Sequence, residues 1–542
     1  MMRLWMRRSP VAQVACSLLL AGSVAASLGS GCSSDANTGT GMEPDGGSPG
    51  DPDGGQPPPP VSCTLPAMPA DVSTPTTVVG SGTAASCTEA ALTAALAQGG
   101  IITFSCGTSP YTLTVTSEKL VTKDTVLDGG GKVTLSGGGM SRILKLSSTY
   151  DKDTPSLTVQ NLRFSGGSTK SLAGAVANGG GAIHRLGGKL LVINSTFDGN
   201  DCPQSGQDVA GGAIFSNGVG ETVIVGSTFT NNTCSNGGAI GNLGNSLNIV
   251  NSIITGNKAT GSGGNPGNGG NGGGVSVDGQ GKTVSLCGVT LSGNQGKAFG
   301  GGLFRVSYQK EPTNINASTV DGNSIPDVSG QPSMAGGLYL QGTTANISAT
   351  TISNNSARGA GGIFMGPLSI VSFTNDTISG NTATASLGGG LVLSDNPNSN
   401  PVSGTILNCT IANNRAPGTV AFGGGVAGGL DLVKLQNSIV ANNIAGNAYN
   451  PINCTKKLGK GGPNIQNPAK WASGADDATQ APCADGVTVV DPKLGQLADN
   501  TGPTRTQAPA ADSPALGKGT GCPATDQRGR PRASMCTLGA VE

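Results

Sequence analysis

The stretch Gly211-Gly-Ala-Ile-Phe-Ser-Asn-Gly-Val-Gly-Glu-Thr-Val-Ile-Val-Gly-Ser-Thr-Phe-Thr-Asn-Asn232 decides the fold of this chain. It holds a Gly-Gly-aliphatic step, a short strand-like run at 222–225 and a closing phrase that ends in asparagine. Eight other closing phrases of this form recur at intervals of 25 to 37 residues and end at Asn200, Asn257, Asn294, Asn323, Asn355, Asn381, Asn414 and Asn443. Repeats of that length are typical of a solenoid, in which each repeat buries its apolar face against the next.

Each repeat contains three short strand-like segments separated by bends, which predicts one triangular coil per repeat. Coils stacked in parallel form an all-β, right-handed parallel β-helix, and residues 101–443 have room for roughly a dozen of them. Glycine pairs permit positive φ at the bends. We expect small aliphatic side chains in a core too narrow for aromatic rings. We also expect the repeated asparagine to stack its amides into a ladder while adopting the left-handed conformation.

A short helix is expected before the coils. Ser86-Cys-Thr-Glu89 has the spacing of a capping box, residues 90–96 are rich in Ala and Leu, and Gly99-Gly100 ends the run. Such a helix would close the exposed end of the solenoid.

Composition narrows the class of protein further. Glycine accounts for 91 of 542 residues and aromatic residues for only 3%, which suits many short strands joined by turns. Lys and Arg together number 31, as do Asp and Glu. The chain therefore lacks the positive charge expected of a nucleic-acid-binding protein, and no nucleic-acid partner is predicted.

The N-terminal region predicts export. Arg3, Arg7 and Arg8 precede an apolar run, so residues 1–31 have the pattern of a lipoprotein-type signal peptide. We expect Cys32 to be lipidated and to anchor the protein to a membrane, with residues 32–60 as a disordered Gly-, Pro- and Asp-rich tether. Ordinary cleavage, for example after Ala26, would instead release a secreted chain.

Cysteine usage agrees with export, because an oxidising compartment favours disulfides. Four local pairs are expected: Cys87 with Cys106, Cys202 with Cys234, Cys454 with Cys483, and Cys522 with Cys536. Cys63, Cys287 and Cys409 are left without a local partner. His184 is the only histidine and no Cys-x-x-Cys occurs, so no metal site is predicted.

Two parts of the chain resemble known families. Gly211–Asn232 resembles the repeat of chlamydial polymorphic outer membrane proteins, and the repeats over 157–443 are similar to those of right-handed parallel β-helix proteins. Residues 491–542 resemble the choice-of-anchor Q module, which ends many secreted bacterial β-helix proteins; Thr501 departs from it by replacing a glycine. The resemblances imply a β-helix with its N-terminal cap over 61–443 and a C-terminal cap module over 444–542. We expect Arg528, Arg530 and Arg532 to pair within that cap.

Polysaccharide lyases and glycoside hydrolases also use β-helices, so this chain could carry catalytic residues of the same kind. Cleavage of a sugar chain requires two carboxylates, or a base with a cationic or calcium-lined groove. His184 and Arg185 are the best candidates for a base and a carboxylate clamp; the alternative is that both are solvated. No cofactor is expected. The alternative is a bound calcium ion, which Asp and Asn side chains near the Gly-rich turns could hold.

The sequence therefore predicts a non-enzymatic β-helix protein at the cell outer membrane or cell surface, or secreted. Its faces would bind a glycan, a matrix polymer or a surface protein in adhesion. The alternative is a polysaccharide lyase or hydrolase on the same scaffold.

Overall fold

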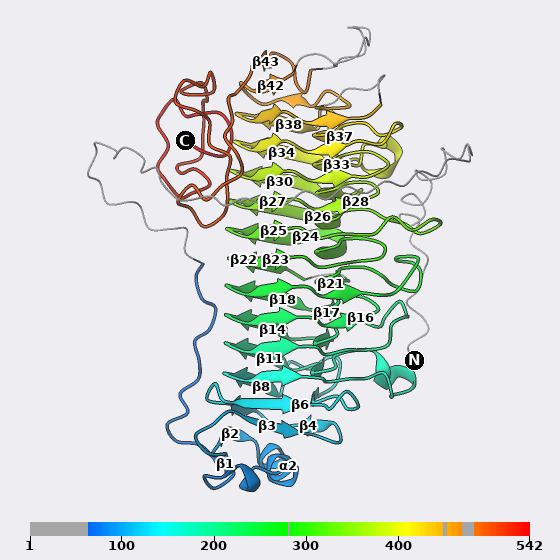
Figure 1. Cartoon of the computed structure of the whole chain (residues 1–542), viewed down its shortest axis with the longest axis vertical. Coiled ribbons are helices and arrows are strands. Elements are labelled where there is room, and N and C mark those ends of the chain that lie inside the picture. The colour runs from blue at the N-terminus through cyan, green and yellow to red at the C-terminus, as the bar shows by residue number, and fades with distance from the viewer. Residues whose placement is uncertain (1–62, 280–281, 448–452, 469–481) are drawn as a thin grey trace, which may run out of the picture. The chain divides into compact units, whose positions relative to one another are not determined.

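The computed structural model describes residues 63–279, 282–447, 453–468 and 482–542, which belong to one compact unit (Figure 1). The predicted signal peptide, Cys32 and the tether lie outside the described residues. Within the described part, no helix is long and apolar enough to span a membrane.

The repeat at 211–232 forms one coil of three strands, β13 (Ile214–Asn217), β14 (Glu221–Val225) and β15 (Thr228–Thr230). Each pairs in parallel with its equivalents in the neighbouring coils without a register shift, so that Ile214 lies between Ile183 and Ile240. About 13 turns stack in this way, and the predicted parallel β-helix is confirmed.

The strands of the coils form two large sheets. The first strands belong to sheet A: β4 (Lys119–Val121), β7 (Leu144–Ser147), β10 (Ile183–Leu186), β13, β17 (Ile240–Leu243), β21 (Val275–Asp278), β24 (Leu303–Asn316), β26 (Leu338–Ser348), β29 (Ile363–Met365), β33 (Leu391–Leu393) and β37 (Val426–Gly428). The second strands, also in sheet A, are β1 (Thr77–Val79), β2 (Gly100–Phe104), β5 (Thr125–Asp128), β8 (Ser156–Gln160), β11 (Lys189–Ile193), β14, β18 (Ser246–Val250), β22 (Val284–Cys287), β30 (Ile370–Thr374), β34 (Ser403–Leu407), β38 (Val433–Gln436) and β41 (Gly459–Lys460).

The third strands form sheet B: β3 (Tyr111–Thr114), β6 (Val133–Ser136), β9 (Arg163–Ser165), β12 (Thr196–Asp198), β15, β19 (Ile253–Thr255), β23 (Thr290–Ser292), β25 (Thr319–Asp321), β27 (Thr351–Ser353), β31 (Thr377–Ser379), β35 (Thr410–Ala412), β39 (Ile439–Ala441), β42 (Ile465–Asn467) and β43 (Thr488–Val489). The long strands β24 and β26 each continue from the first into the second position of their coils.

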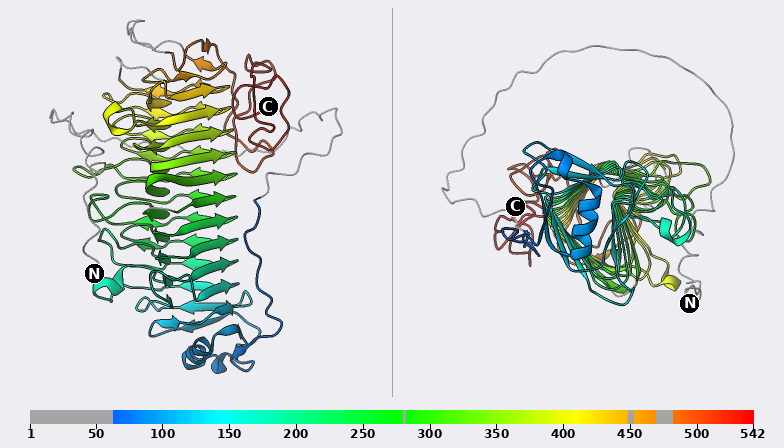
Figure 2. Two further views of the ribbon diagram at one scale, coloured as in Figure 1. Left: turned by 180° about the vertical axis from the view of Figure 1, so that it is seen from behind. Right: turned by 90° about the horizontal axis from the view of Figure 1, so that it is seen from below.

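The predicted helix is present as α2 (Glu89–Gln98), which lies across the end of the first coils in Figure 2. The helix buries its own side chains Leu92, Ala95 and Leu96. The prediction of its start was wrong, because Thr88 rather than Ser86 is the N-cap and its hydroxyl accepts a hydrogen bond from the Ala91 amide at 3.2 Å. Glu89 is consequently free to form an ion pair with Lys119 at 2.6 Å.

Aromatic rings do fit the core, contrary to the expectation from the sequence. Phe164, Phe197 and Phe229 occupy the same inward position in three successive coils. Their rings stack almost in parallel, with centroids 4.8 and 4.6 Å apart. Unshifted parallel register brings equivalent side chains into face-to-face contact, so a stack of rings fills the column as well as a stack of aliphatic residues does.

A buried asparagine ladder runs the length of the repeats, as expected. The Nδ2 of each repeat asparagine from Asn200 to Asn414 donates to the Oδ1 of the next one, and Asn443 donates to Asn453, at 2.9–3.0 Å throughout. The ladder residues do not adopt the left-handed conformation, which was wrongly predicted for them. The residue before each one does so instead, for example Asn231 with φ 56° and Gly256 with φ 68°.

All four expected disulfides are present, at Cys87–Cys106, Cys202–Cys234, Cys454–Cys483 and Cys522–Cys536. A fifth joins two of the cysteines that had no local partner, Cys63 and Cys287, across 224 residues of sequence. The bond ties the start of the described chain to the middle of the column. Cys409 is free and buried.

The C-terminal segment covers more than the last coil. It lies against the outer face of sheet B (Figure 1), where the Thr377 hydroxyl donates to Gln527 at 2.6 Å and the Ala540 amide donates to Thr410 at 3.0 Å. Arg528 pairs with Asp526, and Arg532 pairs with Glu542. The Arg530 guanidinium donates to the Thr501 hydroxyl, so the three arginines pair within this segment as predicted.

The ladder predicts a large effect of Asn323→Ala on stability. Asn323 Oδ1 accepts from the backbone amide and the Nδ2 of Asn294 at 3.0 and 2.9 Å, and its own Nδ2 donates to Leu291 at 2.8 Å. Alanine would leave these buried groups without partners, which costs about 3 kcal/mol of folding free energy. We expect a clearly lower urea midpoint by circular dichroism. Asn248→Ala, at a half-exposed position on β18, is the control; equal midpoints for both variants would contradict the role of the ladder.

Candidate functional site

Arg185 is a structural residue of the column. It points inward from β10 and is fully buried. Its guanidinium donates to the carbonyl oxygens of Gly188, Val219 and Gly218, the last two at 2.8 and 3.1 Å. Burial lowers the pKa of Arg185 to about 10, so it stays charged at neutral pH. Because its donors secure the turns at 188 and 218–219, Arg185 is neither solvated nor open to a substrate carboxylate.

His184 points to the opposite face of β10 and is also buried, with 8% of its surface exposed. Its ring packs against Phe215 at a centroid distance of 5.4 Å, and Nδ1 has no hydrogen-bond partner among the described residues. Burial, together with the charges of Arg142, Lys145 and Arg185, lowers the pKa of His184 to about 3. The ring is therefore neutral and a weak proton acceptor at pH 7, and the alternative of a solvated His184 was also wrong.

His184 belongs to a row of side chains on the outer face of the first strands of sheet A. The register of the sheet places one residue from each of ten successive coils in this row: Lys145, His184, Phe215, Gly241, Ser276, Phe304, Tyr339, Phe364, Val392 and Ala427. Phe304, Tyr339 and Phe364 stack with centroids 5.2 and 4.9 Å apart. Phe299, Met334 and Leu387 pack over them, which makes a second apolar cluster outside the column.

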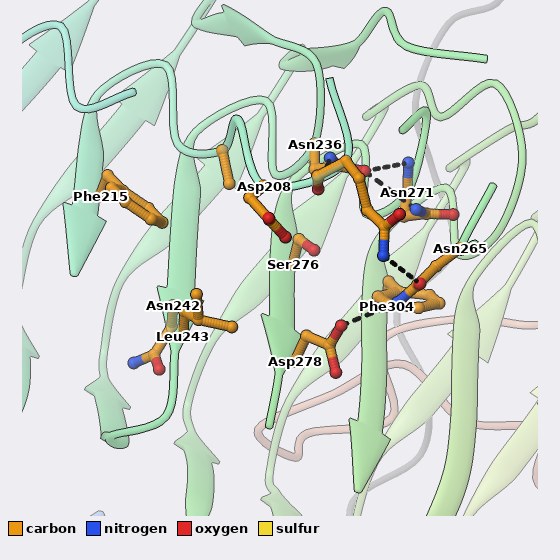
Figure 3. Close-up of a pocket in the computed structure, with 12 residues that line it drawn as sticks. Asp208, Phe215, Asn236, Asn242, Leu243, Asn265, Asn271, Ser276, Asp278 and Phe304 are labelled. Atoms are coloured by element: carbon orange, nitrogen blue, oxygen red, sulfur yellow. Dashed lines mark hydrogen bonds between the residues drawn. The ribbon is translucent and has the colours of Figure 1, made fainter. Parts of the chain in front are cut away.

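The outer row is interrupted at Gly241 and Ser276, between Phe215 and Phe304. The loop at 207–210 comes close at this point, since a Cβ on Gly241 would lie 2.5 Å from the Cβ of Ala210. A hollow, hereafter the row gap and shown in Figure 3, lies beside this break, between Phe215 and Phe304 and next to Ser276. Its volume is about 30 Å³, or about 370 Å³ when the space that opens to solvent is included.

The walls of the row gap are polar. They are formed by two aromatic residues, two carboxylates and several amides from the strands and from the loops at 207–210 and 265–271: Gln207, Asp208, Ala210, Phe215, Asn236, Asn242, Leu243, Asn265, Asn271, Ser276, Asp278 and Phe304. Asn265 Nδ2 donates to the Asp278 carboxylate at 2.7 Å, and Gln207 Nε2 donates to Asn265 Oδ1 at 3.1 Å. Burial raises the pKa of Asp278 above its usual value, and the charge of Asp208 raises it further.

Sequence reasoning missed the row gap. None of its lining residues was among the candidate site residues that the sequence offered. The detectable signal is the residue directly after the first large aliphatic residue that follows each glycine pair, which is aromatic at Phe215, Phe304, Tyr339 and Phe364. That position is Gly241 and then Ser276 in two successive repeats, and Asp278 follows. A break in an aromatic row next to a carboxylate was readable from the aligned repeats.

The described part of the chain contains no group of three or more His, Cys, Asp or Glu side chains arranged to hold a metal ion. The row gap contains two of these residues, Asp208 and Asp278. Among the described residues that line it, none is Lys, Arg or His. The site therefore offers hydrogen-bond acceptors, negative charge and ring faces.

The sequence matches no family model and no curated protein. Among solved structures, the chain is similar to PfbA, a surface adhesin of Streptococcus pneumoniae, with 12% identity and a TM-score of 0.35 over 71% of this chain and 92% of that one. It is also similar to the pectate lyase Pel9A, with 14% identity and a TM-score of 0.35 over 86% and 97% of the two chains. A third similar structure is the A-module of the Azotobacter vinelandii mannuronan C-5 epimerase AlgE4. Its sequence identity is 14% and its TM-score is 0.34, over 77% of this chain and 100% of that one. Likenesses this weak assign no function.

The buried His184 predicts a pH dependence of stability. The unfolded chain binds a proton at the ordinary pKa of 6.5, whereas the folded protein binds one only near pH 3. This residue therefore costs no stability above pH 6.5, and below it the free energy of unfolding falls, by about 2 kcal/mol at pH 5. His184→Phe, which keeps a ring against Phe215, should lose less stability than the wild type between pH 7 and pH 5 in urea unfolding. Equal losses in the two proteins would contradict the neutral, buried state.

Proposed function

We propose that this chain is an exported surface protein that binds a glycan on the outer face of the first strands of sheet A, as in adhesion. The observation that supports it is the row gap, where a hollow with polar walls is framed by Phe215 and Phe304. Aromatic rings beside convergent carboxylates and amides suit a sugar, which presents both C–H faces and hydroxyl groups. The water-accessible space of about 30 Å³ would admit two or three water molecules. One substituent of a sugar ring would therefore enter, while the polymer lies across the surface.

The second candidate is a polysaccharide hydrolase that uses Asp208 and Asp278 as its two carboxylates. The raised pKa of Asp278 is the property that a general acid requires. We favour binding because the space in the row gap is too small for sugar rings on both sides of a bond. A lyase fits less well, since the described lining supplies no cationic side chain or histidine to activate a uronate.

The proposed location is the cell outer membrane or cell surface, through a lipid on Cys32, with a secreted form as the alternative. The five disulfides support an oxidising environment outside the cytoplasm. The resemblance of the repeats to polymorphic outer membrane proteins, and of the C-terminal segment to the choice-of-anchor Q module, belongs to this proposal.

Glycan binding is expected to depend on the row gap. The full mature chain should bind at least one immobilised polysaccharide on a glycan array, and Ser276→Leu should weaken that binding about tenfold by filling the space. Ser372→Leu, at an exposed position on β30, is the matched control and should bind like the wild type. Binding that is unchanged in Ser276→Leu would remove the row gap from the proposal. Release of reducing ends from the bound polymer would favour the hydrolase instead.

Lipidation is expected at Cys32. In cells given labelled palmitate, the full chain should incorporate the label and Cys32→Ala should not. Cys16→Ala, which changes a cysteine inside the apolar run of the signal peptide, is the control and should still be labelled. Equal labelling of Cys32→Ala and the wild type would contradict the anchor.

A further inference from the structure

We infer that the row gap selects sugars that carry a free primary ammonium group, so that the glycan is a hexosamine polymer with unacetylated amines. This inference rests on the proposed function and names the chemical class of its ligand. It follows from which hydrogen-bonding groups of the lining are already used and which are left.

The amide donors of the lining are used within the protein. Gln207 Nε2 donates to Asn265, and Asn265 Nδ2 donates to Asp278. Asn271 Nδ2 donates to Asn236 Oδ1 at 2.9 Å, and Asn236 Nδ2 donates to the carbonyl oxygens of the 206–209 loop at 2.9–3.2 Å. Asn242 Nδ2 donates to Asn245 at 2.9 Å. Each of the five lining amides therefore has a protein acceptor for its NH₂ group.

The acceptors of the lining are not all used. Asn271 Oδ1 is buried and has no hydrogen-bond partner among the described residues, and Asn271 is only 3% exposed. Asn242 Oδ1 also lacks a partner there, but its side chain lies on the inner face of the sheet, in register with Arg185, and does not face the row gap. A buried amide oxygen without a donor costs about 1–3 kcal/mol. A ligand that brings N–H donors would recover this energy, whereas a ligand that brings only acceptors would not.

The charges around the row gap favour a cation. Asp208 comes from the 207–210 loop and Asp278 from the end of β21, and the two carboxylates repel each other. Arg305 on β24, whose charge acts to lower the pKa of Asp278, points to the inner face of the sheet and donates to the carbonyl oxygens of Gly279, Lys282 and Val306. Tyr308, on the same strand, stays neutral at pH 7 because burial raises its pKa to about 12.

A primary ammonium group satisfies these conditions together. It has three donors and no acceptor, and it is small enough for a space that holds two or three waters. It pairs with a carboxylate through charge-assisted hydrogen bonds and is attracted to the faces of Phe215 and Phe304. A uronate would bring a third negative charge, and an N-acetyl group would bring an uncharged carbonyl and a methyl group into the same space.

The test compares two hexasaccharides of the same linkage by isothermal titration calorimetry, glucosamine hexamer and N-acetylglucosamine hexamer, with the full mature chain at about pH 6. We expect the amine form to bind about tenfold more tightly. Asp278→Asn and Asp208→Asn should each remove most of that preference. Asp208 is exposed, so its variant is not expected to disturb folding. Asp431→Asn, at another exposed aspartate, controls for non-specific attraction of a cationic oligomer and should keep the preference.

Equal or tighter binding of the acetylated hexamer, or a preference that survives in Asp208→Asn and Asp278→Asn, would overturn the inference. The two failures are distinguishable. If neutral or acidic glycans bind in a manner that Ser276→Leu abolishes, the proposed function stands and the ammonium preference is wrong. If no glycan binds at all, the proposed function itself fails.

Discussion

The buried asparagine ladder, which runs from Asn200 to Asn453, holds the coils of the repeats in register with one another. Each ladder amide accepts from the backbone and side chain of the coil before it, and its Nδ2 donates to the coil after it, as at Asn294, Asn323 and Asn355. A slip of a single residue would break all these bonds and turn the inward side chains outward. Because the ladder sets the register, side chains at equivalent positions stack in straight rows on both faces of every sheet.

The proposed function depends on a break in one of those rows. Inside the column, Phe164, Phe197 and Phe229 stack on one another across successive coils, as the aliphatic core residues do. Outside, the stacked rings of Phe304, Tyr339 and Phe364 pack against Phe299, Met334 and Leu387. Where the outer row continues, the surface is filled with apolar side chains, and where it stops at Gly241 and Ser276, polar groups line the space that is left. The site is thus a local exception to a repeated contact.

The architecture was largely predictable from the sequence, because the Gly-Gly-aliphatic step and the closing asparagine recur in nine of the roughly 13 coils and have direct structural causes. The disulfide between Cys63 and Cys287 was not, since loop spacing says nothing about partners 224 residues apart. His184 and Arg185 drew attention as rare polar residues, yet residue type alone does not show that Arg185 turns inward onto backbone carbonyls. The row gap was missed because it is defined by small residues, and their effect depends on the rings in neighbouring coils.

A crystal structure of the full mature chain with bound glucosamine hexamer would test the central claim most directly. The account predicts one sugar at the break between Phe215 and Phe304, with its amino nitrogen within hydrogen-bonding distance of the Asp278 carboxylate. It also predicts that this nitrogen donates to Asn271 Oδ1, a buried amide oxygen that has no partner among the described residues of the free protein. A hexamer bound elsewhere on the column, or bound here with its amino group directed away from Asp278, would contradict the account.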